Sequence, residues 1–434
     1  MTARTQIQLA RALALPALLF LLAQTIHAAP LIVGTCLPGT QFTTISAAVG
    51  AAPPGSTIHV CPGTYPEQVT ISNTSNLTLV GVESGTSDAA VVVPPSGGLV
   101  HNATDFFGNQ VAAQIFVQNA TAVTIARLTV DGSANGLSGC TTNLEGIYFQ
   151  NSSGSVMNNA VRNQMLAANL GCQVGLAINV ESTGTPAVTV SNNSVHNYQK
   201  NGITADGVGE GSGPTVTVTG NTVIGIGPNP SIAQNGIQIG FGATGSVQNN
   251  RVADDIYTGS NAQGSGILIY ASENVTASNN TVETTQAGVA TASDPADGPA
   301  NGATITSNHI GGTQNFDAID LCSSNNTAES NVIDGSAQSG VHADDSCPSS
   351  GTGNTIEHNT INEACAGILE GPSATGNTVA PNTFFNVTTT VLTGTDTCAP
   401  PSASAATAAL SSNSTTKTHS ARPSPYRPNA HQPN

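Results

Sequence analysis

Acidic side chains and one histidine gather in a short stretch of the C-terminal half of the sequence. They are Asp317, Asp320, His342, Asp344 and Asp345. Carboxylates held close together raise one another's pKa or recruit a cation, and Ca²⁺ prefers oxygen ligands. One hypothesis is therefore a Ca²⁺ site formed by Asp320, Asp344 and Asp345. Another is an acid and base for glycoside hydrolysis. In that case the catalytic candidates are Asp317, Asp320, His342 and Asp344. The third interpretation is that these residues simply form a solvated acidic surface.

A second group combines two cations with possible bases. Arg162 precedes His196 by one sequence repeat, and Tyr198 and Lys200 follow His196 closely. Elimination from a polyuronate needs a cation to neutralise the sugar carboxylate and a base to take the C5 proton. Arg162 could be the cation, and Lys200, His196 or Tyr198 the base. The alternative is that these are ordinary surface residues, since only their position in the repeat links them.

An Asn-x-Val/Ile motif recurs along the chain and predicts the elements that position these groups. Its copies are 18 to 34 residues apart and begin at Asn159, Asn193, Asn221, Asn250, Asn280, Asn308, Asn331, Asn359 and Asn377. A second motif, Gly-apolar-x-apolar, follows each of the first eight copies, with Ala318 replacing the glycine once. Repeats of this length, with two short strands each, are typical of one coil of a parallel β-solenoid.

The physical chemistry of the repeat supports stacked coils. Apolar residues alternate in each strand, as in Ile237 and Ile239, so one side of the strand faces inward. A single coil cannot bury that side, whereas coils stacked at about 4.8 Å can. Asparagines at one fixed turn position would then hydrogen-bond to each other along the stack. A β-sandwich would instead need tight turns every 8–12 residues, which the in-phase asparagines disfavour.

Stacking also predicts which residues become neighbours. Counted from the glycine motif, Asp320 and His342 occupy the same position on adjacent coils, about 5 Å apart at the backbone. The same count from Gly146 and Gly175 aligns Tyr148 with Ala177. Counted from the asparagine motif, Arg162 aligns with His196. Phe42–Val49 has helical spacing and is expected to form a short helix that caps the N-terminal end of the core.

Composition and charge exclude some functions. Of the 434 residues only 8% are charged, with 9 Lys and Arg against 25 Asp and Glu. Nucleic acid is not an expected partner, because the phosphate backbone demands clustered cations. Residues 1–28 are typical of a secretory signal peptide, and the apolar run Ala12–Ala23 is too short to span a bilayer, which needs about 20 residues. The sequence therefore predicts export to a secreted, periplasmic or envelope location, without a membrane span.

The eight cysteines fit an exported protein, because disulfides persist outside the cytosol. Pairing in chain order would close loops of about 25–33 residues and stabilise the fold by roughly 3–4 kcal/mol each. The expected pairs are Cys36–Cys61, Cys140–Cys172, Cys322–Cys347 and Cys365–Cys398. Eight cysteines allow 105 arrangements, so sequence alone leaves the connectivity open.

The opening segments Gly55–Val60 and Pro62–Glu67, with the Asn-x-Ile and Gly-Ile-x-Leu repeats, resemble right-handed parallel β-helix proteins of the pectin-lyase-like superfamily. The resemblance covers about residues 36–390 and implies an all-β fold, a single-stranded right-handed parallel β-helix. Phe316–Asp320 is also similar to the paired-Asp segment of polygalacturonase-like β-helix enzymes, although their adjacent Asp-Asp and downstream Arg-Ile-Lys are absent.

The expected organisation is a signal peptide (1–28), a β-helix domain (29–398) and a disordered Ser/Ala/Thr/Pro-rich tail (399–434). The expected partner is an extracellular polysaccharide or glycan, bound on an outer face of the solenoid. Two functions follow. The first is a polysaccharide lyase or glycoside hydrolase, and the second is a non-catalytic structural or adhesive envelope protein. Ca²⁺ is the cofactor considered, and the sequence assigns no oligomeric state.

Overall fold

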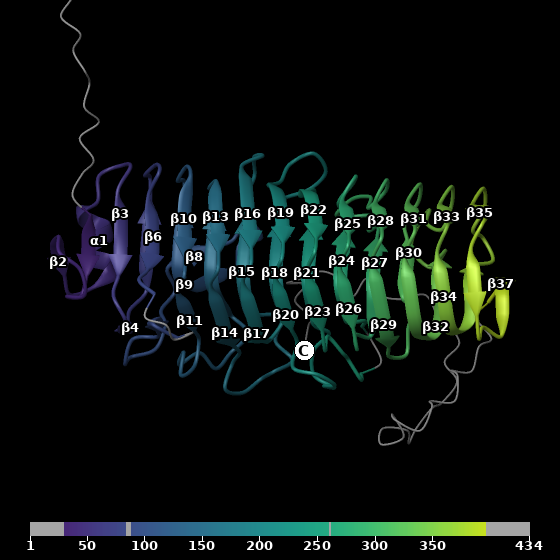
Figure 1. Ribbon diagram of the computed structural model, residues 1–434, viewed down its shortest axis with the longest axis horizontal. Helices are drawn as coiled ribbons and strands as arrows, with labels where there is room; N and C mark the ends of the chain where they lie inside the picture. Colours follow the sequence, from purple (N-terminus) through teal and green to yellow (C-terminus); the bar gives the residue numbers. More distant parts are fainter. Residues whose placement is uncertain (1–29, 84–87, 260–261, 396–434) are drawn as a thin grey trace, which may run out of the picture.

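The computed structural model describes residues 30–83, 88–259 and 262–395, which form one elongated stack of coils (Figure 1). The predicted signal peptide (1–28) and tail (399–434) lie outside the described residues. Strands of successive coils pair in parallel, and within the described ranges only β8 (Ala103–Thr104) and β9 (Gln110–Gln118) pair antiparallel. The predicted parallel solenoid is therefore confirmed.

Most coils in the body of the stack contain three strands, whereas in the coils of β32 (Val332–Ala343) and β34 (Thr360–Glu370) the second and third strands are continuous. In one coil the three strands are β19 (Thr215–Thr219), β20 (Thr222–Ile224) and β21 (Asn235–Gly240). The prediction of two strands per coil is wrong. The repeat motifs miss the strand that precedes each asparagine, because the motifs begin at an Asn or a Gly and this strand carries neither at a fixed position.

The first strands of the coils form a 14-stranded sheet. Its other members are β1 (Leu31–Val33), β2 (Thr40–Phe42), β3 (Thr57–Val60), β6 (Thr78–Gly81), β10 (Val123–Ala126), β13 (Gly154–Met157), β16 (Ala187–Ser191), β22 (Thr244–Gln248), β25 (Thr276–Ser278), β28 (Thr304–Thr306), β31 (Thr327–Glu329), β33 (Thr355–Glu357) and β35 (Thr378–Val379).

The second and third strands are joined in a 23-stranded sheet. Besides the strands already given, it contains β4 (Gly63–Pro66), β5 (Val69–Ser72), β7 (Ala90–Val93), β11 (Thr129–Asp131), β12 (Thr142–Gln150), β14 (Ala160–Gln164), β15 (Leu176–Glu181), β17 (Ser194–Tyr198), β18 (Asn201–Asp206), β23 (Arg251–Ala253), β24 (Ser265–Tyr270), β26 (Thr281–Glu283), β27 (Ala287–Ala292), β29 (His309–Thr313), β30 (Ile319–Cys322), β36 (Thr383–Phe385) and β37 (Thr389–Thr393).

The third strand of each coil separates the core from the surface that carries the site. In β18, Ile203 and Ala205 belong to the core, so Thr204 and Asp206 point away from it. The alternation repeats in the strands stacked on β18. We call the outward-facing surface of β12, β15, β18, β21, β24, β27, β30 and β32 the acidic face.

The predicted asparagine ladder is present along the inside of the turns. From Asn159 to Asn331, the side-chain amide of each asparagine donates to the side-chain oxygen of the next at 2.9–3.1 Å. The ladder continues through Asn359 and ends on Asn382 rather than on the predicted Asn377. Asn377 instead accepts from Asn354 in a second ladder, because an 18-residue interval is too short to complete a coil.

The strand glycines have a packing reason. A Cβ added to Gly202, Gly236 or Gly266 would overlap a valine methyl group of the neighbouring second strand. At these positions the third strand lies so close to that valine that there is room for the hydrogen of glycine but not for a side chain. The Gly-apolar-x-apolar motif is therefore a structural feature of the coil and identifies no activity.

The ends and cross-links of the stack agree with the predictions. Helix α1 (Ile45–Ala51) lies at the purple N-terminal end in Figure 1 and buries Ile45 and Ala48 against the core. The pairs Cys36–Cys61, Cys140–Cys172 and Cys322–Cys347 are confirmed as disulfides. Cys365 is also disulfide-bonded, and its expected partner Cys398 lies outside the described residues. Among the helices described, none is long and apolar enough to cross a membrane.

Candidate functional site

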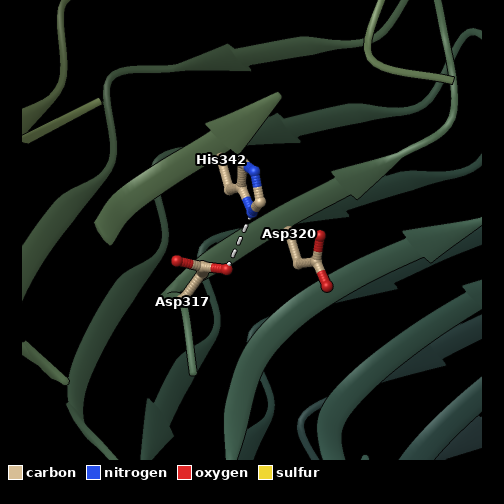
Figure 2. Close-up of side chains that lie close together, drawn as sticks. All are labelled: Asp317, Asp320 and His342. Atoms are coloured by element: carbon tan, nitrogen blue, oxygen red, sulfur yellow. Dashed lines mark hydrogen bonds and ion pairs between the residues drawn. The ribbon is translucent and has the colours of Figure 1, made fainter. Parts of the chain in front are cut away.

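The structure brings Asp317, Asp320 and His342 together on the acidic face (Figure 2). Asp320 in β30 and His342 in β32 are paired residues of adjacent coils, as the column count predicts. Asp317 precedes β30, and its Oδ2 lies 3.1 Å from His342 Nδ1. One ligand atom from each of the three residues lies within 4.8 Å of the other two, and all three side chains are buried.

Neighbouring side chains hold this cluster in place. The backbone N–H and the hydroxyl of Ser339 donate to Asp317 Oδ1 at 2.9 and 2.6 Å, which leaves Oδ2 directed at the imidazole. Gln263 donates from Nε2 to Asp320 Oδ2 at 3.3 Å. The cluster is thus oriented from two coils and from the loop that precedes β24.

The cluster is strongly coupled electrostatically. Burial alone would lower the pKa of His342, but the carboxylates of Asp317, Asp344 and Asp320 raise it to about 10. Burial alone would raise the pKa of Asp317, but the positive charge of His342 and the Ser339 hydrogen bonds lower it. In this arrangement Asp317 and His342 form a buried ion pair at neutral pH.

The remaining members of the predicted acidic group point elsewhere. Asp344 accepts the N–H and the hydroxyl of Ser346, each at 2.8 Å. Asp345 accepts the N–H of Ser373, in the turn of the following coil. The predicted Ca²⁺ ligands Asp320, Asp344 and Asp345 therefore do not form the compact three-residue group seen in the described part of the chain, which is Asp317, Asp320 and His342.

The structure divides the second predicted group. Arg162 and His196 are paired residues of adjacent coils, as predicted. Arg162 is already engaged, because its Nε lies 2.8 Å from Asp131 and its Nη1 lies 3.1 Å from Asp88. Burial, followed by the charge of Arg162, lowers the pKa of His196.

Tyr198 and Lys200, the other two residues of that group, are buried, whereas Arg162 is partly exposed. Tyr198 is part of the hydrophobic core and donates to Asp255 Oδ1 at 2.5 Å. Lys200 donates from Nζ to the carbonyl of Ala233 at 2.7 Å, and burial lowers its pKa to about 8. These four residues do not converge on one surface.

A third set of carboxyl groups, which the sequence did not single out, lies on the acidic face. Glu145, Glu181 and Asp206 belong to the successive coils of β12, β15 and β18, and we call them the acid row. Glu181 pairs with Asp206 in register. All three are at most 5% exposed.

The sequence alignment of the coils missed Glu181 because it was wrong by two residues in the coil that contains β15. The alignment of Tyr148 with Ala177 is wrong, because Tyr148 pairs with Asn179. Gly175 has φ +90° and lies in the turn, so Ala177 takes the place of the strand glycine in this coil. Matching the apolar residues, Ile178 with Ile147, would have placed Glu181 in the column of Asp206.

The acid row is tightly hydrogen-bonded. The Tyr148 hydroxyl donates to Glu181 Oε2, and the backbone N–H of Phe106 donates to Glu181 Oε1 at 3.0 Å. Gln238 donates to Asp206 Oδ1 at 3.1 Å. The turn that carries Phe106 therefore covers Glu181.

Glu145 lies on the coil before Glu181 but is out of register with it, because it pairs with Leu176. Asn143 and Asn179 donate to its Oε1 at 2.9 and 3.1 Å. Glu145 Oε2 and Asn179 Oδ1 are buried and have no hydrogen-bond partner among the described residues. This part of the row is rich in oxygen acceptors and poor in donors.

Burial and mutual repulsion shift the acid row towards its neutral form. Burial raises the pKa of Glu181 to about 8 and that of Asp206 to about 7, and the charge of Asp105 adds to both. Burial, followed by the charge of Glu181, raises the pKa of Glu145 well above its ordinary value. At neutral pH the row therefore contains protonated carboxyl groups, which can donate a proton or a hydrogen bond.

Comparisons with known proteins identify the fold. A family model described as a right-handed β-helix region matches residues 206–384. No protein of curated function has a significantly similar sequence. The chain therefore has the right-handed parallel β-helix fold.

Solved structures with this fold have diverse functions. The catalytic unit of the GH87 α-1,3-glucanase from Streptomyces thermodiastaticus is 16% identical at a TM-score of 0.51, over 82% of this chain and 66% of that one. The Dettilon tailspike protein is 16% identical at a TM-score of 0.53, over 79% and 64%. PfbA, a surface adhesin of Streptococcus pneumoniae, is 14% identical at a TM-score of 0.50, over 80% and 88%. The chain spans about two thirds of the first two proteins, and identities this low establish the fold alone.

Proposed function

We propose that this protein is exported and hydrolyses an extracellular glycan on the acidic face, with Glu181 and Asp206 as the catalytic carboxyl pair. The observation that carries the proposal is the placement of these two groups on adjacent coils, where backbones are about 4.8 Å apart. Retaining glycosidases use two carboxyl groups about 5 Å apart, one as acid and one as nucleophile.

The environments of the two carboxyl groups suggest their roles. Glu181 has the higher pKa, about 8, and is the proton donor. Asp206 has a pKa of about 7, ionises first, and is the nucleophile or base. Two interacting carboxyl groups share protons, so these roles describe the pair that titrates together.

One exposed aromatic residue near the pair, Phe107, offers apolar surface to sugar rings, whereas its ring neighbours Phe241 and Tyr270 are buried. The ring of Phe107 lies 5.0 Å from that of Phe241, which lies 5.1 Å from that of Tyr270. Phe107 is 43% exposed and belongs to the turn that covers Glu181. Substrate entry requires this turn to lift, and Phe107 would then contact the glycan.

The charges around the pair favour a neutral glycan. Asp105 acts on both Glu181 and Asp206 and would repel a polyuronate. A neutral glucan meets no such repulsion. The fold shared with an α-1,3-glucanase is consistent with this substrate class.

A non-catalytic adhesive role is the second candidate. It is favoured by the burial of Glu181 and Asp206, which are 2% and 5% exposed. The alignment with the adhesin PfbA also covers 88% of that protein. In this case the glycan would bind without being cleaved.

A polysaccharide panel tests the proposal. Reducing ends and unsaturated products are measured for the wild type, Glu181→Gln, Asp206→Asn and Asp320→Asn. The expected result is hydrolysis of a neutral glycan that falls by about 10²-fold or more in the first two variants. Glu283→Gln is the control, because Glu283 is exposed and paired with Arg251.

The other outcomes separate the alternatives. Loss of activity in Asp320→Asn alone would place catalysis in the Asp317–Asp320–His342 cluster. Binding without products for every glycan would support the adhesive role. Unsaturated products would indicate a lyase and contradict the proposed hydrolysis.

A further inference from the structure

We infer that Asp317, Asp320 and His342 form a binding site for a divalent first-row transition metal ion, Zn²⁺ or Mn²⁺. The site is separate from the acid row, because β30 and β15 are separated along the stack by β18, β21, β24 and β27. The inference stands without the proposed glycan hydrolysis, since metal binding is measured on the protein alone.

The distances fit one ion between the three side chains. Two neighbouring ligands bonded to one ion at about 2.0–2.2 Å lie roughly 2.8–3.1 Å from each other in octahedral geometry and roughly 3.3–3.6 Å in tetrahedral geometry. His342 Nδ1 and Asp317 Oδ2 lie 3.1 Å apart, close to the octahedral distance. The ion would take the place of the proton that His342 Nδ1 holds in the ion pair, and that proton would be released to solvent. Asp320 offers a third ligand atom within 4.8 Å of both, so a small closure of its side chain completes the set.

The surroundings orient the ligands in advance. Both Ser339 hydrogen bonds are made to Asp317 Oδ1 and leave Oδ2 as the ligand atom. Metal sites commonly use such outer hydrogen bonds to fix their carboxylates. The side chains of Asp317 and His342 are 2% and 8% exposed, so water competes weakly for the ion.

The ligand types select the ion. Ca²⁺ takes six to eight oxygen ligands, whereas this group offers one imidazole nitrogen and few oxygens. Imidazole with carboxylates suits Zn²⁺ and Mn²⁺, and the absence of a thiolate from this group disfavours Cu(I). Three protein ligands would leave a coordination position open to water or a substrate oxygen, as in catalytic metal sites.

The test is metal binding by the full-length protein after treatment with EDTA. Titration calorimetry and elemental analysis after dialysis measure affinity and stoichiometry for Zn²⁺, Mn²⁺ and Ca²⁺. One Zn²⁺ or Mn²⁺ per chain is expected. His342→Gln and Asp320→Asn should each weaken binding by at least about tenfold.

A matched control uses the exposed His309–Asp334 pair. His309 Nε2 lies 3.0 Å from Asp334 Oδ2, and both side chains are about half exposed. His309→Gln removes the same kind of group outside the cluster and should leave binding unchanged. Near-ultraviolet circular dichroism confirms that each variant is folded. If His342→Gln fails to fold, Asp320→Asn carries the test.

Three results would overturn the inference. The first is no Zn²⁺ or Mn²⁺ bound by the wild type. The second is wild-type affinity in folded Asp320→Asn and His342→Gln. The third is an equal loss in His309→Gln, which would indicate nonspecific binding by histidine.

Discussion

Raising the pH should destabilise this fold through the acid row, and Glu181 allows the effect to be isolated. Glu181 is buried, and its pKa is raised from 4.5 to about 8. Between these values the folded chain keeps a proton that the unfolded chain has released. The contribution of Glu181 to stability is therefore fully present below pH 4.5 and is lost as the pH rises towards 8. At about 1.4 kcal/mol per pH unit, this interval corresponds to a loss of about 5 kcal/mol.

Glu181→Gln removes the ionisable group and keeps its size. Guanidinium unfolding with the disulfides intact, between pH 4.5 and 8, measures the free energy of unfolding of both proteins. The wild type should lose up to about 5 kcal/mol more than the variant over this range. Asp206 titrates beside Glu181, so the variant should retain part of the dependence.

The matched control is Glu283→Gln, which changes an exposed glutamate and should keep the wild-type pH dependence. Two results would refute the reasoning. One is a wild type that is equally or more stable at pH 8 than at pH 4.5. The other is a Glu181→Gln variant with the full wild-type loss, which would show that Glu181 is hydrated in the folded protein.

Three further predictions concern the coil. Asn250→Ala interrupts the asparagine ladder and leaves the buried groups of its neighbours unpaired. Denaturant unfolding should show that the free energy of unfolding falls by about 2–4 kcal/mol, and a fall of less than about 1 kcal/mol would contradict this. Gly236→Ala should lower the free energy of unfolding by about 1–3 kcal/mol, because the added Cβ overlaps a valine. Gly50→Ala is the control, because a Cβ there meets nothing within 4 Å and should not destabilise the fold. Equal melting midpoints for the two variants would disprove the packing argument. Replacing Cys322 and Cys347 by serine should cost about 3 kcal/mol and lower the melting temperature, and an unchanged melt would dismiss this stabilisation.

The coil architecture could be predicted because it depends on local, repeated residues. Each inward asparagine of the Asn159–Asn331 series is satisfied by the next asparagine and by a backbone carbonyl, an arrangement that stacked coils supply at every repeat. The adjacency of Asp320 and His342 followed directly from the stacking. The order of the cysteines along the stack similarly agreed with local pairing.

The candidate site was less predictable, because a short offset changes which residues become neighbours. Gly175 lies in a turn and not in the strand, so aligning the coils on this glycine gave a register that was wrong by two residues and missed Glu181. Tyr198 and Lys200 were expected beside Arg162, but Tyr198 at the end of β17 packs in the core and Lys200 is buried just after that strand. Asp317 was predicted as catalytic, yet its contact with His342 depends on Ser339 from the next coil.

The amino-acid sequence by itself therefore determined the winding of this chain, since the repeat length, the asparagines and the alternating apolar residues allow few other ways to bury them. Only the tertiary structure decided which carboxyl groups lie together, and which of them hold a proton. A pKa depends on burial and on charges within a few ångströms, and residues such as Glu145, Glu181 and Asp206 become neighbours only when the coils are stacked.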